Sequence, residues 1–75
     1  MYQIILENKG RIDGIINNFY AEMLGITPQY VSNMLTGKLP VKEIIAKGIL
    51  SIAYNIPITD DSMNQLLEKH FIKVK

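Results

Sequence analysis

Four uncharged polar side chains lie close together in the chain: Gln29, Tyr30, Ser32 and Asn33. Gln and Asn each carry donor and acceptor atoms that can pair in a bidentate manner with N6 and N7 of adenine. A Ser hydroxyl donates or accepts a hydrogen bond, and a Tyr side chain stacks or bonds to a phosphate. These side chains are equipped to contact the edges of bases if a single element presents them together on its outer side.

A helix over about 28 to 36 is predicted to be that element. Thr27 can cap its first turn, and Pro28 suits the first helical position, where a missing N–H costs nothing. Gly37 is expected to close the helix. Val31 and Met34 then form the inward side, which leaves the polar side chains facing outward or at the exposed N-terminal end.

A second helix is predicted just before this one, and a short turn joins the two. Asp13 is a candidate N-cap, the start lies between 14 and 18, and Gly25 ends the helix. A steep turn between two helices needs a small inward residue, a residue tolerant of left-handed φ, and apolar residues that lock the pair together. The sequence supplies these in order as Ala21, Gly25 and Ile26. The apolar positions at helical spacing are Ile15, Ile16, Phe19, Tyr20, Met23 and Leu24.

The rest of the chain contains no repeat and no linker, so residues 1–75 are interpreted as one domain. Residues 3–9 fit a short helix closed by Gly10, although the run YQIIL is equally compatible with a strand. After Pro40, apolar residues mark one stripe of a long core helix that Pro57 ends, and Gly48 within it indicates close helix approach. Thr59 or Asp60 is expected to cap a fifth helix, and the tail 72–75 is either frayed or a short strand.

The stretch Asn17 to Lys38, with its spacing Ala21, Gly25, Val31, Met34, resembles the helix-turn-helix of the Cro and CI-type phage repressors, also called the lambda-repressor-like or XRE family. The resemblance continues into LPVKEIIAKGIL and covers roughly half of the chain. It implies an all-α, compact five-helix DNA-binding domain with the helix-turn-helix at about 17–36. Two departures are visible: the segment Arg11 to Asn18 is long for the link between the first two helices, and helix 28–36 contains no Lys or Arg.

The resemblance also implies a set of DNA-contacting residues. Gln29 and Asn33 are the first candidates for base contacts, followed by Ser32 and Tyr30, although Tyr30 can instead pack on the preceding helix. The candidates for phosphate contacts on either side of the groove are Asn17, Asn18, Thr27, Thr36, Lys38 and Lys42. The fifth helix offers a candidate surface for a homodimer or another partner, made of Met63, Leu66, Leu67, His70 and Phe71. The tail is an alternative dimer surface, and the stripe on the fifth helix can instead pack inside the domain.

Composition narrows the class of protein. A chain of 75 residues forms a small core, and the hydrophobic fraction of 48% with a mean hydropathy of +0.12 predicts that some apolar surface is covered by association. The net charge of +1 neither favours nor excludes a nucleic-acid partner. The absence of cysteine excludes disulfides. No run is apolar enough for a bilayer, so a cytoplasmic protein is expected. The residues show no catalytic, metal-binding or cofactor-binding pattern, and no enzyme is expected.

These observations support several hypotheses for function. The first is a Cro-like repressor, from a phage lysis and lysogeny switch, that binds a double-stranded DNA operator as a homodimer. The second is an anti-repressor or modulator of repression that binds a CI-type repressor protein, which the uncharged helix 28–36 and the high apolar content favour. A third is an antitoxin or chromosomal regulator of the same family. The plainest alternative is an ordinary helical corner without any nucleic-acid partner.

Overall fold

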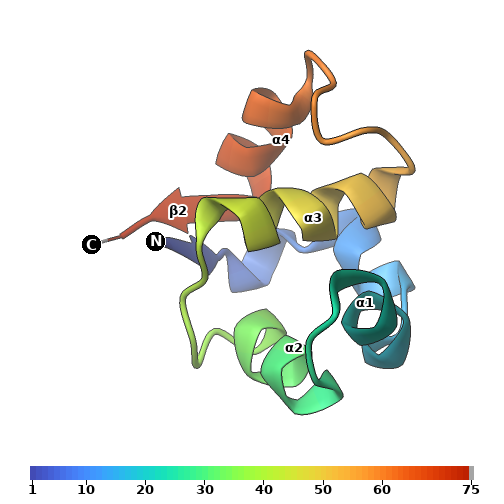
Figure 1. The fold of residues 1–75 in the computed structure, drawn as a ribbon. Coiled ribbons are helices and arrows are strands. Elements are labelled where there is room, and N and C mark those ends of the chain that lie inside the picture. Colours follow the sequence, from blue (N-terminus) through green and yellow to red (C-terminus); the bar gives the residue numbers. More distant parts are fainter. Residues whose placement is uncertain (75) are drawn as a thin grey trace.

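A computed structural model describes residues 1–74 of the chain. One long helix crosses the middle of the molecule, with two short helices on one side of it and a fourth helix on the other (Figure 1). The two ends of the chain lie next to each other, where two short strands pair. In chain order the elements are β1 (Tyr2–Ile4), two 3₁₀ helices (Leu6–Asn8 and Gly10–Gly14), α1 (Asn17–Leu24), α2 (Pro28–Leu35), α3 (Glu43–Tyr54), α4 (Met63–His70) and β2 (Phe71–Lys73).

The predicted five-helix, all-α fold is wrong, because the first segment of the chain is a strand. Residues 3–9 contain the end of β1 and a single 3₁₀ turn instead of an α-helix. β1 pairs with β2 in an antiparallel register that places Gln3 opposite Ile72 and Ile4 opposite Phe71. The strand was one of the two alternatives for YQIIL. Its partner lies at the other end of the chain, so local periodicity did not decide between them.

Hydrogen bonds on both sides hold β1 in place. On the side away from β2, Tyr2 and Val41 exchange two backbone bonds, of 2.6 and 2.8 Å. The Gln3 side chain donates a hydrogen bond to the carbonyl oxygen of Gly37, just after α2. β1 therefore joins the end of α2, the approach to α3 and the tail, and it fixes how these segments sit relative to each other.

The tail was left open between a frayed end and a short strand, and β2 is that strand. The N–H of Val74 donates to the carbonyl oxygen of Met1 at 2.8 Å, which extends the pairing by one residue beyond β2. The last residue of the predicted tail, Lys75, lies outside the described residues.

The expected caps of α1 and α4 are wrong, although both helices form. Asp13 belongs to the second 3₁₀ helix, and α1 begins at Asn17 behind an extended Ile16. At α4, the Asp60 carboxylate accepts hydrogen bonds from the backbone N–H and the hydroxyl of Ser62, and the helix begins only after it. These two bonds hold the pKa of Asp60 below its ordinary value. Asp60 thus bonds within the turn before α4, and Asp13 lies in the 3₁₀ helix that ends before α1.

The long helix α3 is the centre of the core, as its apolar stripe predicts. It ends at Tyr54, where Asn55 takes the left-handed conformation with φ of 55° and donates its N–H to the carbonyl oxygen of Ser51. Leu24 of α1 packs directly against Gly48, because a Cβ placed on Gly48 would lie 2.7 Å from Leu24 Cδ2. The expected close approach at this glycine is confirmed, and it brings α1 against α3.

Candidate nucleic-acid interface

The turn between α1 and α2 is built by three residues with distinct tasks. Gly25 has a φ of +68°, a left-handed conformation that glycine adopts without steric cost, and its N–H bonds to the carbonyl oxygen of Ala21. Thr27 accepts a hydrogen bond from the N–H of Tyr30 at 3.1 Å, and Pro28 occupies the first helical position. The cap, the proline and the left-handed glycine agree with the sequence-based expectation for this turn.

The inner faces of the two helices lock them in one orientation. Ala21 of α1 and Val31 and Met34 of α2 are buried, as predicted from their spacing. Tyr20 is also fully buried, and its hydroxyl donates to the carbonyl oxygen of Ile12 at 2.8 Å. The orientation of the outward face of α2 is consequently determined by the buried side chains on the opposite side of the helix, and not by the side chains of the outward face itself.

That outward face carries Gln29, Asn33 and Thr36, which lie four and three residues apart and so on one side of the helix. Gln29 is exposed and Asn33 is half-buried, and Gln29 Nε2 donates to Asn33 Oδ1 at 3.1 Å. This bond does not use Gln29 Oε1, which can still accept a hydrogen bond, or Asn33 Nδ2, which can still donate one. Holding two flexible side chains together before binding lowers the entropy lost when they meet a ligand.

Ser32 and Tyr30 flank this face on opposite sides. Ser32 is half-buried, and its backbone carbonyl already accepts a hydrogen bond from the Thr36 hydroxyl at 2.8 Å. Tyr30 is half-buried and packs against the core, where it lines a pocket with Ile26 of the turn and Ile45 of α3. The structure therefore groups Gln29 and Asn33 at the centre of the face and leaves Ser32 and Tyr30 at its edges.

The two threonines predicted to contact phosphate have hydrogen bonds within the chain. Thr27 caps α2, and the Thr36 hydroxyl satisfies carbonyl oxygens of the last turn of α2. Both side chains are exposed, and a hydroxyl oxygen that makes one bond retains a further lone pair. Each is thus placed at one end of α2 with its position fixed.

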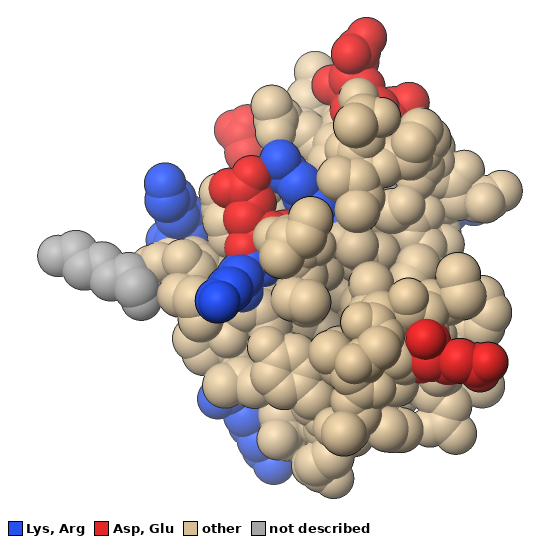
Figure 2. Space-filling view, in the orientation of Figure 1, with Lys and Arg blue, Asp and Glu red and all other residues tan. Residues whose placement is uncertain are grey.

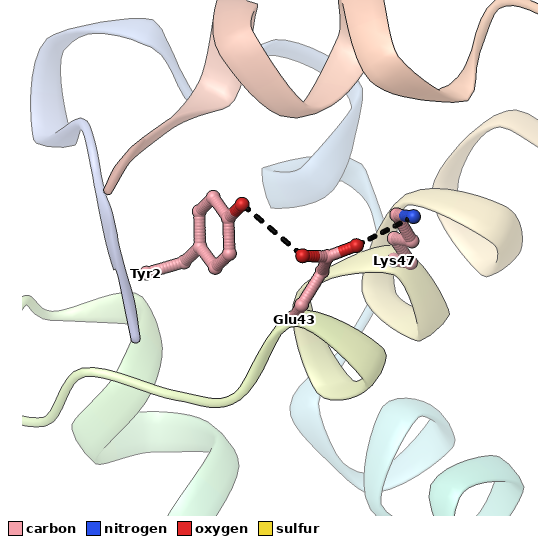
Figure 3. Close-up of polar contacts among 3 residues, drawn as sticks. All are labelled: Tyr2, Glu43 and Lys47. Carbon is pink, nitrogen blue, oxygen red and sulfur yellow. Dashed lines mark hydrogen bonds and ion pairs between the residues drawn. The ribbon is translucent and has the colours of Figure 1, made fainter. Parts of the chain in front are cut away.

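The nearest positively charged residues come after α2 in the sequence, and α2 itself contains none. Lys38 is exposed just after Gly37, and Lys42 is exposed as the residue that precedes α3. The neighbouring carboxylate of Glu43 is occupied, since Lys47 Nζ lies 2.7 Å from it and the Tyr2 hydroxyl donates to it at 3.2 Å (Figure 3). Lys47, together with the Tyr2 hydroxyl, holds the pKa of Glu43 below its ordinary value. The one acidic group beside Lys42 is therefore partly neutralised by its own partners.

On the other side, Asn17 and Asn18 begin α1. Asn18 is exposed and Asn17 is half-buried. The preceding residue, Ile16, makes no side-chain cap, so the first N–H groups of α1 depend on solvent or on a bound anion. The two asparagines thus lie at an uncapped helix end.

The surface over α1 and α2 is nearly free of charge. Between residues 17 and 36 the only charged residue is Glu22. Figure 2 shows this face as mostly uncharged, with an acidic group at one side and Lys or Arg groups toward the other, where acidic groups lie among them. Any contact with DNA would rely on hydrogen bonds and shape for α2 itself, and on cations from the segment that follows it.

The partner surface predicted on the fifth helix, which is α4 in the structure, does not form an exposed face. Met63, Leu67, His70 and Phe71 are buried within the chain, and Leu66 is half-buried. They pack on α3 and on the strands, which is the packing alternative noted in the sequence. Of these five side chains, Leu66 alone is more than marginally exposed to a partner in the folded chain.

His70 is the polar member of this buried group. Its Nδ1 lies 2.6 Å from the carbonyl oxygen of Asn8 and must donate to it, and Nε2 lies 2.6 Å from the Tyr54 hydroxyl. The imidazole therefore joins the N-terminal segment, α3 and α4. Its role is to hold the structure together, and the described residues contain no cluster of three His, Cys, Asp or Glu that would hold a metal ion.

One surface feature was missed in the sequence. Ile16, Phe19 and Met23 were grouped with the apolar positions of α1, but they are 72%, 45% and 60% exposed. The sequence did contain a signal, because six apolar positions within ten residues are more than one face of a short helix can bury. Phe19 and Met23 lie on the outer side of α1, and Ile16, the extended residue just before the helix, is exposed as well; the three are called the α1 stripe.

Comparisons with known proteins do not identify a family. No protein-family model matches the chain, and the curated proteins and the solved structures likewise give no match. Within residues 1–74, no helix has both the length and the apolar character needed to span a membrane.

Proposed function

We propose that the chain binds double-stranded DNA in the major groove through the outward face of α2 and acts as a small transcription regulator. The observation that carries the proposal is the hydrogen-bonded pair of Gln29 and Asn33, displayed on a helix whose orientation is fixed by the turn at Gly25 to Thr27. The resemblance of Asn17 to Lys38 to the Cro and CI-type helix-turn-helix supports the same function.

The chemistry of the pair suits adenine. An α-helix fits into the major groove, where adenine presents the acceptor N7 and the donor N6. Gln29 offers its free Oε1 and its second Nε2 hydrogen, and Asn33 offers Nδ2 and the second lone pair of Oδ1. Each bidentate contact of this kind discriminates against a wrong base by about 1–3 kcal/mol. Two of them on one helix face are enough for a preference over a short stretch of sequence.

Phosphate contacts would come from Lys38 and Lys42 on one side and from Asn17 and Asn18 on the other. Only the two lysines carry charge, so the electrostatic part of binding is small. If both contact phosphates, the logarithm of the binding constant falls against the logarithm of salt with a slope of about −2 for each subunit. Two subunits on a pseudo-palindromic site, with half-sites about 34 Å apart, would double that slope.

The test begins with selection of duplexes from a random library, followed by fluorescence anisotropy on the enriched sequence. The double variant Gln29→Ala, Asn33→Ala is expected to lose about thirtyfold or more in affinity, because two base contacts disappear. The matched control is Asn64→Ala, Gln65→Ala, which removes the same two residue types from exposed positions on α4. Failure to enrich any sequence, or equal binding by the two double variants, would rule out the proposal.

A second candidate function is supported by a different observation. The exposed apolar stripe on α1 and the near absence of charge on α1 and α2 are features of a protein-binding surface. The chain would then modulate repression by binding a repressor protein, for which a CI-type repressor is the candidate. The two functions use different faces, so one chain can carry both.

A further inference from the structure

We propose that the chain forms a symmetric homodimer in which the outer edges of β2 from two copies pair as antiparallel strands, with Ile72 at the two-fold axis. The inference deepens the proposed function, because a pseudo-palindromic site is bound by two subunits. Its evidence is the hydrogen-bond pattern of the sheet, and its test involves no DNA, so either proposal can fail without the other.

The hydrogen bonds of the sheet show which backbone groups of β2 point away from β1. In an antiparallel pair, residues that exchange hydrogen bonds alternate with residues whose N–H and C=O groups point to the opposite edge. The carbonyl oxygen of His70 and the N–H of Val74 both bond to the N-terminal segment, so the even-numbered residues of this strand face β1. The backbone groups of Phe71 and Lys73 therefore point to the outer edge.

Lys73 offers both of its backbone groups at this edge. Its partner across the sheet, Tyr2, bonds to Val41 on the far side, as expected for a pair that does not exchange hydrogen bonds. Phe71 adds its carbonyl oxygen, since its N–H already bonds to the carbonyl oxygen of Leu67 in α4. Within residues 1–74 no strand lies beyond β2. Such an unpaired edge is a template for pairing with another strand.

One register suits two identical edges. If Phe71 of one copy lies opposite Lys73 of the other, the Lys73 N–H donates to the Phe71 carbonyl oxygen in both directions, and Ile72 lies opposite its own counterpart. Ile72 is 56% exposed in the single chain, so this contact covers an apolar side chain that the chain itself leaves open. The next register along the strand places two Lys73 side chains directly opposite each other, and like charges in that position destabilise a strand pair.

The same register brings opposite charges together. Side chains of directly opposite residues lie on the same face of a sheet, so the second copy's Lys73 comes to lie beside Phe71. A pocket of about 390 Å³ borders Phe71, and Asn64 and Glu68 of α4 form part of its wall. Among the residues that the structure describes, neither Glu68 nor Lys73 forms a salt bridge. The second copy's ammonium group therefore supplies a charge complementary to the exposed Glu68.

The position of α2 favours a second copy over an unrelated strand. Gln3 and Ile72 share one face of the sheet, and the Gln3 side chain bonds to the carbonyl oxygen of Gly37 just after α2. The end of α2 is therefore on the face that carries Ile72, while α4 lies on the other side of the strands (Figure 1). A two-fold axis between antiparallel edge strands is perpendicular to the sheet, so equivalent faces of the two copies point the same way. Such a dimer presents both α2 helices on one side.

Sedimentation equilibrium of the full chain measures the association. A strand edge of three residues makes fewer contacts than a standard interface, so a dissociation constant of about 10 μM to 1 mM is expected. Ile72→Glu should weaken association by about tenfold or more, because two carboxylates then face each other across the axis. Met23→Glu is the matched control, since Met23 is 60% exposed on α1, and it should leave association unchanged.

Cysteine crosslinking tests the register, and the chain is suited to it because it contains no cysteine. In the proposed register the two Ile72→Cys positions are directly opposite and not hydrogen-bonded, with Cα atoms about 4.5 Å apart, which is within the range of a disulfide. The two Lys73→Cys positions lie diagonally, about 7–8 Å apart, and should not bridge. Under mild oxidation the Ile72→Cys chain is expected to form a covalent dimer about tenfold faster than the Lys73→Cys chain.

The outcomes separate the alternatives. A chain that remains monomeric at about 1 mM, or association that Ile72→Glu does not weaken, would overturn the proposal. Association that is lost in Met23→Glu and kept in Ile72→Glu would assign the contact to the α1 stripe instead. Crosslinking of the Lys73→Cys chain as fast as that of the Ile72→Cys chain would contradict the register. A monomer that still binds its selected duplex would leave the proposed function intact, and a dimer that binds no DNA would refute only that function.

Discussion

The side chain of Tyr20 connects α1 to the 3₁₀ helix that precedes it. It is fully buried, and its hydroxyl donates to the carbonyl oxygen of Ile12 in the second 3₁₀ helix. Burial, with a smaller contribution from the charge of Asp13, raises the pKa of Tyr20 to about 12. The neutral phenol is therefore a requirement of the folded state, and a charged phenolate at this position would favour unfolding.

This shift predicts alkaline unfolding. Because the pKa in the folded state is above the unfolded value of 10.0, the contribution to stability is complete below pH 10 and is lost as the pH rises toward 12. The loss should be about 2–3 kcal/mol, measured by urea unfolding across this pH range. Tyr20→Phe should be less stable by about 1 kcal/mol at pH 7, because one hydrogen bond is lost, and much less sensitive to pH. An unchanged pH dependence in Tyr20→Phe would contradict this account.

Residue-level signals succeeded where the relevant partner is close in the sequence. Thr27, Pro28 and Gly25 do what their types predict, because a cap, a first-turn proline and a left-handed glycine act on neighbouring backbone groups. Asp60 failed as a cap because its carboxylate bonds to Ser62 instead, and Asp13 failed because it lies in a 3₁₀ helix that ends before α1 begins. Outward spacing placed Gln29 and Asn33 on the exposed side of the helix, and the family resemblance made them candidates for base contacts, but the hydrogen bond between them was not predicted.

At the scale of elements, the packing of α1 on α3 depends on Gly48. A glycine inside a helix costs about 1 kcal/mol relative to alanine, and here it makes room for Leu24. Leu24 is at the end of α1, so the contact sets the distance between the helix pair and the core. The sequence indicated a close approach at this position, although it did not identify the partner.

A double-mutant cycle tests the contact. In a Leu24→Ala background, Gly48→Ala should stabilise the domain by about 1 kcal/mol, because only the helix propensity changes. In the original chain the new Cβ must displace Leu24, so the same substitution should be neutral or destabilising. The two effects should differ by about 1–2 kcal/mol in urea unfolding. Equal effects in both backgrounds would show that Leu24 does not occupy the space above Gly48.

The main error of the sequence analysis concerns β1, an element whose partners lie far away in the sequence. Helices α1 to α4 were predicted because apolar spacing, Gly and Pro are local signals. The segment of β1 was left open between helix and strand and was counted as a helix in the predicted fold, because its identity depends on Val41 and on β2, which lie far away in the sequence. Two strands of three residues each provide too little pattern on their own.

At the scale of the whole molecule, two faces with different chemistry are available for partners. The outward face of α2 carries amide side chains, and cations follow it at Lys38 and Lys42. The stripe of Ile16, Phe19 and Met23 on α1 is apolar and lies next to negative charge. Sequence periodicity identified the first face but not the second, since it cannot tell which of two apolar sides of a helix is buried by the rest of the chain. The apolar side of residues 63–71 was expected to be a partner surface, but most of it is buried in the core. Periodicity could not distinguish these two possibilities either.

The most direct test of the central claim is to titrate the isotope-labelled chain with the duplex enriched by selection and to follow its backbone amide NMR signals. The account predicts shifts concentrated in residues 27–38, at Asn17, Asn18 and Lys42, with the signals of Phe19, Met23 and α4 unchanged. Shifts concentrated on the α1 stripe and residues 51–57, or no shifts at all, would contradict the placement of α2 in the major groove.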